Sequence, residues 1–295
     1  MAYIRAENDR KPKRLEYIAA DGFIHCKLCG KTKEYLDQHG ALMEVFGEGN
    51  ESGRCNCTWI LVKIESNRRT AFKDQRSANA TFDIDDNPDS DNSKLARNFA
   101  NLFSTNEQQR GLLFCGGCGS GKSFLAACIA NAIIDRGFTA KFTSISEIER
   151  DLWAAKDKNT VFNDLVEHDL IILDDFSAER KTEYMGSISY DVIDWIYRSR
   201  KTLIVTTNLA PNEFETNDLT KQRIYSRLLE MTLPVKVTGK DRRKVWLKNC
   251  ADTERERLIN AAADNEYSYH IVNQINHVNP HDRDNDKYDI YSEFQ

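Results

Sequence analysis

The residues best suited to chemistry form the run GGCGSGKS at positions 116–123. The run has the spacing GxxxxGKS and stands between an apolar segment, LLFC, and a segment of helical character. In that setting, glycines let successive backbone N–H groups turn inward around phosphates, and the start of a helix favours negative charge. Lys122 would reach the β- and γ-phosphates, and the Ser123 hydroxyl would ligate Mg²⁺. The predicted phosphate-binding loop comprises Gly116, Gly117, Cys118, Gly119, Ser120, Gly121, Lys122 and Ser123.

Two apolar runs further along the chain end in polar side chains. LIILDD ends with Asp174 and Asp175, and LIVTTN ends with Asn208 after two threonines. Parallel sheets present ligands at the carboxyl ends of their strands, so we expect these side chains near the phosphates. Asp174 would hold Mg²⁺ through water, and Asp175 would orient or deprotonate the attacking water. Asn208 would contact the γ-phosphate or that water.

Four of the eight cysteines stand in two close pairs, CKLC and CNC. Four thiolates in two closely spaced pairs suit a closed tetrahedral Zn²⁺ site. In so short a segment the metal would supply much of the folding free energy. The predicted zinc ligands are Cys26, Cys29, Cys55 and Cys57.

Other arrangements of the same residue types stay open. The four cysteines would be buried free thiols if no metal binds, and His25 or His39 could replace one thiolate. Cys115 and Cys118 also spell CxxC, but the loop that holds them already has the form that phosphate requires.

In the middle of the chain, short apolar runs alternate with helical stretches. Runs that are apolar on both faces suit a parallel sheet covered by helices. The run FLAACIANAIIDRG, which Gly137 ends, supplies the first covering helix. The sequence therefore predicts an α/β fold, a parallel sheet flanked by helices. The strand candidates are GLLFC, TAKFTSI, DLIILDD and TLIVTTN.

Composition divides the chain into four parts: a zinc-binding domain over 1–68, a linker over 69–94, a nucleotide-binding domain over 95–250 and a tail over 251–295. The linker contains TFDIDDNPDSDNS, whose residue types favour turns and bury little apolar surface. The tail carries ten acidic against four basic residues, and the rest of the chain is almost electroneutral. Any nucleic-acid site must therefore be a local basic patch.

No run approaches the roughly 18 uncharged apolar residues of a membrane span, and no secretion signal is evident. We expect a cytoplasmic protein with no membrane partner.

Taken in order, the motifs GGCGSGKS, LIILDD, TTNL, RIYSRL and GKDRRK resemble the DnaC/IstB-like branch of AAA+ ATPases over about residues 95–248. The resemblance implies an AAA+ P-loop core that binds ATP and self-associates through this domain. It implies that Arg227 is an arginine finger for a neighbouring subunit, with Arg223 as a second candidate, and that Arg243 is a sensor arginine in its own subunit. AAA+ ATPases usually carry Glu where this chain has the shorter Asp175, which favours slow hydrolysis.

A cysteine-rich domain before such an ATPase looks like the arrangement of helicase loaders of the DnaI type. That resemblance implies that residues 1–68 dock on a replicative DNA helicase during initiation of DNA replication, in a protein that a phage or another mobile element encodes. IstB-like transposition helpers resemble the ATPase domain equally well, and a nucleotide-dependent adaptor without useful turnover is a third possibility.

The family resemblance also implies contacts with single-stranded DNA. The loop FSAERKTEYMGS offers phosphate-pairing charge and a stacking ring, and the segment ERDLWAAKDK offers Trp153 with Lys156 and Lys158 as a second candidate. For both segments a solvated surface is the alternative. The DNA-binding residues expected in the loop are Arg180, Lys181, Thr182 and Tyr184.

Overall fold

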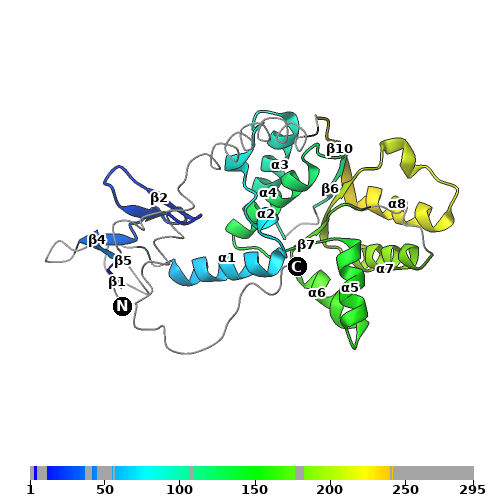
Figure 1. The fold of residues 1–295 in the computed structure, drawn as a ribbon, viewed down its shortest axis with the longest axis horizontal. Helices are drawn as coiled ribbons and strands as arrows, with labels where there is room; N and C mark the ends of the chain where they lie inside the picture. The colour runs from blue at the N-terminus through cyan, green and yellow to red at the C-terminus, as the bar shows by residue number, and fades with distance from the viewer. Residues whose placement is uncertain are drawn as a thin grey trace, which may run out of the picture. The chain divides into compact units, whose positions relative to one another are not determined.

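The central feature of the protein is a five-stranded parallel sheet, in the strand order β10–β6–β9–β8–β7. Figure 1 labels β10, β6 and β7 of this sheet. Every neighbouring pair in this sheet runs parallel. The strands are β6 (Gly111–Cys115), β7 (Ala140–Thr143), β8 (Leu170–Leu173), β9 (Thr202–Thr207) and β10 (Thr232–Lys236). The structure is a computed structural model, and it describes residues 3–4, 12–36, 42–44, 55, 57–105, 109–176, 183–239 and 241.

The side chains of the inner strands alternate between two hydrophobic cores. On β6, Leu112 and Phe114 belong to one core, and Leu113 and Cys115 belong to the other. Successive side chains of a strand point to opposite faces, so a sheet covered on both sides needs strands that are apolar throughout. Burial of one Leu or Phe side chain stabilises the fold by about 1.5–3 kcal/mol. This two-sided burial fixes the strands from which the polar site residues emerge.

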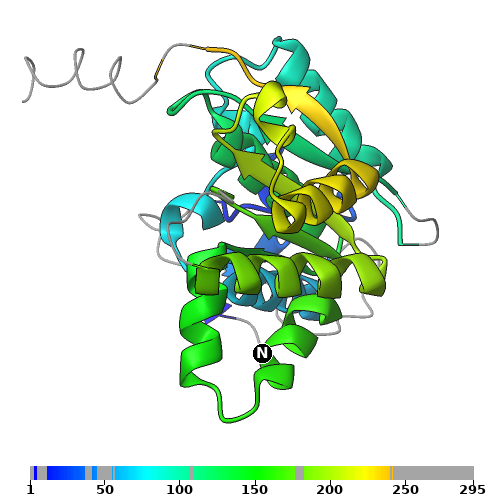
Figure 2. The ribbon, with the colours of Figure 1, turned by 90° about the vertical axis from the view of Figure 1, so that its right-hand side faces the viewer.

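Helices cover both faces of the sheet (Figures 1 and 2). One core includes residues of α3 and α4, and the other includes residues of α5, α6, α7 and α8. Ser90, Ser144 and Asp218 start three of these helices by accepting hydrogen bonds from backbone N–H groups of the first turn. The bounds are α3 (Asp91–Leu102), α4 (Lys122–Asp135), α5 (Ile145–Ala154), α6 (Lys158–Glu167), α7 (Glu183–Ser199) and α8 (Leu219–Met231), with a short turn η3 (Pro211–Phe214) before α8.

Part of the segment 69–94 packs on the α4 side of the sheet. Phe72 and Ala80 are buried in that core. The fully buried amide of Asn131 on α4 donates hydrogen bonds to the carbonyl oxygens of Ser77 and Ala80. Widely spaced apolar side chains therefore anchor a run whose composition favours turns. The elements here are α1 (Thr58–Ala71), α2 (Gln75–Ala78) and η2 (Phe82–Ile84).

Short antiparallel strands precede α1. β2 pairs with β3, placing Glu16 opposite Cys26, and β1, β5 and β4 form a second small sheet. Lys33 and Glu16 form a buried ion pair of 2.9 Å, from Nζ to Oε1. The strands are β1 (Tyr3–Ile4), β2 (Glu16–Ile18), β3 (Ile24–Cys26), β4 (Glu34–Leu36) and β5 (Leu42–Glu44).

The expectation of an α/β fold with a helix-flanked parallel sheet is confirmed, and all four strand candidates form strands. The fifth strand, β10, was not expected, because Pro234 lies in its middle. Proline is tolerated there since β10 lies at the edge of the sheet and, among the described strands, pairs only with β6. The described residues up to β10 belong to one compact unit. Within the described ranges, no helix has both the length and the apolar character needed to cross a bilayer.

Candidate nucleotide site and metal centre

The loop between β6 and α4 has the backbone geometry of a phosphate-binding loop. Gly121 precedes α4 with a φ of 101°, a left-handed conformation that favours glycine. A Cβ atom on Gly116 would lie 2.1 Å from the carbonyl oxygen of Val237, so only glycine fits beside the chain that leaves β10. Helix α4 begins at Lys122, and the free N–H groups of its first turn can receive an anion.

Two side chains of this loop have polar groups available to phosphate. The Lys122 ammonium donates hydrogen bonds of 2.8 Å to the carbonyl oxygens of Gly116 and Gly117, and one of 2.9 Å to Asn208 Oδ1. Burial lowers the pKa of Lys122, which reflects an ammonium that lacks the full set of water contacts. The Ser120 hydroxyl is buried, and within the described residues it has no hydrogen-bond partner. A phosphate group would satisfy both.

The carboxylates expected at the end of β8 lie beside the end of β9. Asp174 Oδ1 accepts a hydrogen bond of 2.6 Å from the Thr206 hydroxyl, which itself accepts one of 2.9 Å from the backbone N–H of Asp175. Asn208 Nδ2 donates to Asp175 Oδ1 over 3.2 Å. A chain of hydrogen bonds thus links Lys122, Asn208 and Asp175. Asp175 has a φ of 52°, a strained conformation that Asp and Asn tolerate better than most residues.

The oxygen atoms available near the loop suit a hard cation. Ser123 is exposed in the first turn of α4, and Asp174 is partly exposed at the end of β8. A hydroxyl and a carboxylate are ligand types that Mg²⁺ takes beside the oxygens of a nucleotide. The donor set therefore fits the magnesium ion expected with a triphosphate.

Two of the three expected arginines, Arg223 and Arg227, lie on α8. Arg227 on α8 lies against α7, where it forms a 2.6 Å ion pair with Asp194. Arg223, one turn earlier on α8, is exposed. Arg243 lies outside the described residues.

Most of the expected DNA-binding residues cannot be placed. Arg180, Lys181 and Thr182, together with the Tyr184 side chain, lie outside the described part of the chain. The second candidate segment is described: Trp153 near the end of α5 is 72% exposed, and Lys156 in the turn to α6 and Lys158 at the start of α6 are exposed. In Figure 2 this turn forms the tip of a helical hairpin.

The four cysteines predicted to bind zinc come together. Each offers a sulfur, and the four sulfurs lie within 4.8 Å of one another. Sulfurs bound to one tetrahedral Zn²⁺ at about 2.3 Å would be about 3.8 Å apart, so the cluster fits the ion with small shifts. β3 carries the first cysteine and the last one caps α1. The members are Cys26, Cys29, Cys55 and Cys57, and Cys29 alone among them is exposed.

The structure bears on two of the alternatives to this ligand set, a histidine ligand and the CxxC of the phosphate loop. His25 engages both ring nitrogens elsewhere, Nδ1 with the Gly30 carbonyl at 2.9 Å and Nε2 with Asp21 at 2.8 Å. His39 lies outside the described residues. The CxxC of the phosphate loop is split, with Cys115 buried and Cys118 exposed, and burial raises the pKa of Cys115 to about 11. Its thiol is therefore neutral and poorly suited to metal or redox chemistry.

Two features of the site were not expected from the sequence. The Thr206 hydroxyl bridges the Asp174 carboxylate and the backbone N–H of Asp175, and the repeated threonine before Asn208 was its only signal in the sequence.

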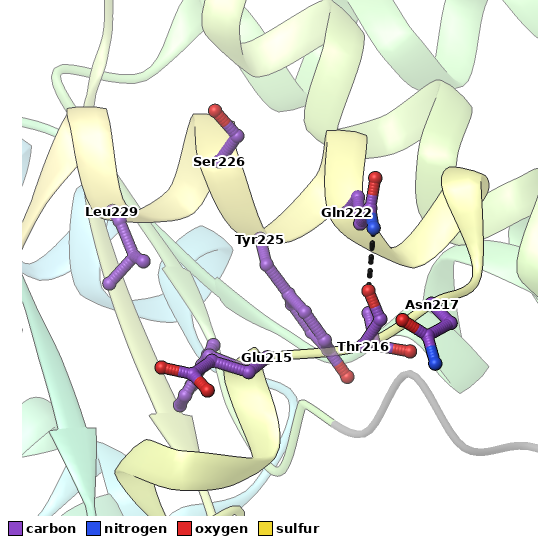
Figure 3. A pocket seen from close by; sticks show the side chains of 8 residues that line it. Glu215, Thr216, Asn217, Gln222, Tyr225, Ser226 and Leu229 are labelled. Carbon is purple, nitrogen blue, oxygen red and sulfur yellow. Dashed lines mark hydrogen bonds between the residues drawn. The ribbon is translucent and has the colours of Figure 1, made fainter.

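An open hollow of about 650 Å³ lies between the segment after η3 and α8 (Figure 3). In it Gln222 Nε2 donates 2.6 Å to the Thr216 carbonyl, and no motif marks this place.

Comparison with known proteins gives a consistent set of relatives. The profile of a family described as IstB-like ATP binding protein matches residues 63–248. The chain is 25% identical over 208 residues to the replicative helicase loader DnaI of Bacillus subtilis (strain 168), which covers 61% of this chain and 64% of DnaI. It is 26% identical over 141 residues to the replicative helicase loader DnaC of Escherichia coli (strain K12), covering 45% and 55%.

A solved crystal structure of DnaI is similar in fold, with a TM-score of 0.51 and 19% identity over 60% of this chain and 98% of that one. The chain spans less than two thirds of the length of these two curated relatives.

Proposed function

This chain belongs to the family of IstB-like ATP-binding proteins, and on that premise we propose that it is an ATP-dependent loader of a replicative ring helicase onto single-stranded DNA. Its fold is an AAA+ P-loop core, as the motifs imply. The observation that carries the proposal is one chain with two sites: a phosphate loop bonded to Asn208 and a four-cysteine cluster ahead of the ATPase domain. DnaI, which is a helicase loader, is the relative that matches most of this chain among those described above.

In the proposed cycle the phosphate loop and the strand ends bind and hydrolyse ATP. Lys122 would exchange its loop carbonyls for the β- and γ-phosphates, and Ser123 and Asp174 would hold Mg²⁺. The ion would neutralise charge on the phosphates. Asp175 would orient the attacking water or accept its proton, with Asn208 fixing the carboxylate at 3.2 Å. Turnover would be slow, because an Asp reaches less far than the usual Glu.

Completion of the site would require a second copy. Arg227 would act in the ATP site of a neighbour, where an arginine supplied in trans accelerates phosphoryl transfer by about 10³- to 10⁵-fold. Arg243 would sense the nucleotide in its own subunit. The ATPase domain would therefore self-associate in the presence of ATP.

The cysteine cluster would serve docking by folding the N-terminal domain. Zn²⁺ bound by the four thiolates would cross-link β3 to the start of α1 and strengthen the small core that the cysteines form with Leu61. We assign residues 1–68 to the helicase contact, 69–94 to the connection, 95–250 to the ATPase domain and 251–295 to an acidic tail.

Single-stranded DNA would meet the ATPase domain at loops that carry charge beside an aromatic ring. Arg180, Lys181, Thr182 and Tyr184 form the first proposed contact. The exposed ring of Trp153 with Lys156 and Lys158 forms the second, because a stacking ring beside basic side chains suits the bases and phosphates of a single strand.

Capture of the partner tests the proposal. Tagged protein would be mixed with cell extract in ATP and in ADP, and the bound proteins would be identified. We expect a hexameric replicative helicase with the wild-type chain and its loss with Cys26→Ser, whereas His25→Ala should retain it. A chain that binds DNA and turns over ATP but never captures a helicase would contradict the loader function.

The alternative is an IstB-like transposition helper, which the family profile favours as directly as it favours a loader. The same capture experiment distinguishes the two, because a helper would bind a transposase in ATP and would leave the helicase unbound. Turnover that is unaffected by single-stranded DNA and by protein partners would instead favour a nucleotide-dependent adaptor.

A further inference from the structure

Arg227 is held on its own subunit by a cluster on one face of α7. Its Nη2 lies 2.6 Å from Asp194 Oδ1, and its guanidinium carbon lies 5.0 Å from the ring centre of Tyr190 and 5.5 Å from that of Tyr197. The three α7 residues are spaced four and three apart, which places them on the same side of the helix. A carboxylate and two aromatic faces are the groups that a guanidinium binds best.

The cluster on α7 does not satisfy all the hydrogen-bonding groups of Arg227. Its Nη1 is buried, and among the described residues neither Nη1 nor Asp194 Oδ1 has an aligned hydrogen-bond partner. The pair is therefore held by charge and ring contacts and not by a directed bidentate bond. A triphosphate, which offers several oxygens to a planar guanidinium, would satisfy the N–H donors of Arg227 better.

Release of Arg227 would not leave the carboxylate alone. Asp194 Oδ2 also lies 2.8 Å from Nε of Arg198, which is one turn further along α7 and 75% exposed. Tyr197 is fixed separately, since its hydroxyl donates to Glu230 Oε1 over 3.0 Å. The cluster can therefore lose Arg227 and keep a counter-charge for Asp194.

From this geometry we propose that Asp194 stores the Arg227 guanidinium in the free subunit and releases it to the triphosphate of a neighbouring copy. The inference rests on the proposed function, because it takes Arg227 as the residue that completes the neighbour's site. It adds a way to regulate assembly, because Asp194 neutralises the charge of Arg227 until ATP bound to a second copy competes for the guanidinium. Asp194 is a positioning residue, and it touches no reacting atom.

The test is the dependence of ATP turnover on protein concentration, measured with full-length protein. Asp194→Asn should lower the concentration for half-maximal turnover by about 3- to 10-fold, with the maximum unchanged, because the finger no longer leaves a charged partner. Asp194→Glu retains the carboxylate and should stay near the wild-type value. Arg198→Ala should raise the concentration for half-maximal turnover, because Arg227 is then the remaining described cation beside Asp194 and is held more tightly.

A matched control is Asp164→Asn, which removes the carboxylate of the Lys141–Asp164 ion pair (2.7 Å) on another covering helix and should change neither value. The double variant Asp194→Asn with Arg227→Ala should behave as Arg227→Ala alone. Thermal unfolding of each variant separates loss of fold from release of the finger.

Three outcomes distinguish the possibilities. Storage of Arg227 by Asp194 is overturned if Asp194→Asn, at normal stability, needs the same protein concentration as wild type for half-maximal turnover. It is also overturned if the maximal turnover of Asp194→Asn falls. Arg198→Ala gives an independent answer if Asp194→Asn does not fold, and an unchanged or lowered concentration there overturns storage as well. Wild-type turnover that does not depend on concentration would instead contradict the shared site of the proposed function.

Discussion

The Lys122 ammonium donates a hydrogen bond of 2.9 Å to Asn208 Oδ1, 86 residues further along the chain. The same Asn208 donates through Nδ2 to Asp175 at 3.2 Å. One amide thus joins the phosphate-binding lysine to the carboxylate proposed to direct water. A γ-phosphate that entered the loop would compete for Lys122 and change the hydrogen bonds of Asn208, so we expect this side chain to couple nucleotide state to the position of the Asp175 carboxylate.

Lys122→Ala is expected to abolish ATP binding and to leave the fold and the zinc content intact. The ammonium contacts loop carbonyls and Asn208, so its loss removes charge at the phosphates, and we expect the sheet to be unaffected. We expect nucleotide affinity to fall by at least about 100-fold. Titration with a fluorescent ATP analogue measures it. Lys141→Ala, which removes a surface partner of Asp164, is the control, and unchanged affinity in Lys122→Ala would rule out the phosphate-loop assignment.

Asn208→Ala should separate binding from turnover. The variant frees both Lys122 and Asp175, so ATP affinity should stay within a few-fold of wild type, while the carboxylate loses its support and turnover falls by about 100-fold. Steady-state hydrolysis at saturating ATP is the measurement. Asn212→Ala, in the exposed turn η3, should leave turnover unchanged. Normal turnover in Asn208→Ala would mean that this amide has no part in the reaction.

The cysteine cluster predicts one tightly bound zinc per chain. Cys26→Ser or Cys55→Ser should unfold the N-terminal domain and release the metal without stopping ATP binding, because the cluster forms a small core separate from the two cores of the parallel sheet. A strong chelator should have the same effect. Metal analysis and limited proteolysis report the two results.

His25→Ala is the matched variant for the zinc site. Both of its ring nitrogens are engaged with Gly30 and Asp21, so the variant should keep its zinc. Zinc well below one per chain in carefully purified wild-type protein would argue for free thiols, and zinc loss in His25→Ala would place a histidine among the ligands.

Much of the fold could be predicted because its signals are local. The strands β6, β8 and β9 are apolar on both faces, and the GxxxxGKS spacing marks Gly116 and Gly121 as loop glycines. The close approach of the Val237 carbonyl to Gly116 is visible only in the structure. The packing of Phe72 and Ala80 on the sheet could not be predicted, since their neighbours are polar and the residues that cover them lie far along the chain. β10 was hidden by Pro234, which only an edge position allows.

The site residues also include some that the sequence predicts and some contacts that it does not. Asp174, Asp175 and Asn208 are visible as polar residues at strand ends, so their approach follows from parallel topology alone. The contact between Arg227 and Asp194 depends on how α7 and α8 pack, and two charged residues on separate amphipathic helices carry no mark of pairing in the sequence.

The last prediction concerns assembly. Arg227→Ala should keep ATP binding near normal and lose hydrolysis, whereas Lys122→Ala loses both. Neither chain turns over ATP alone, because one lacks the finger and the other lacks the phosphate-binding lysine. A mixture of the two distinguishes a finger that acts in a neighbour's site from one that acts in its own.

In a head-to-tail assembly of randomly mixed chains, about a quarter of the contacts pair an intact phosphate loop from an Arg227→Ala chain with an intact finger from a Lys122→Ala chain. Hydrolysis should return at those contacts and should follow the mixing ratio, with a maximum near equal amounts. If Arg227 acted within its own chain, every subunit would carry one defect and no ratio would restore turnover. Arg223→Ala in place of Arg227→Ala tests the exposed arginine one turn earlier on α8 in the same way. A mixture shown to co-assemble that stays inactive at every ratio would reject the shared site and favour a chain that binds ATP as a solitary unit.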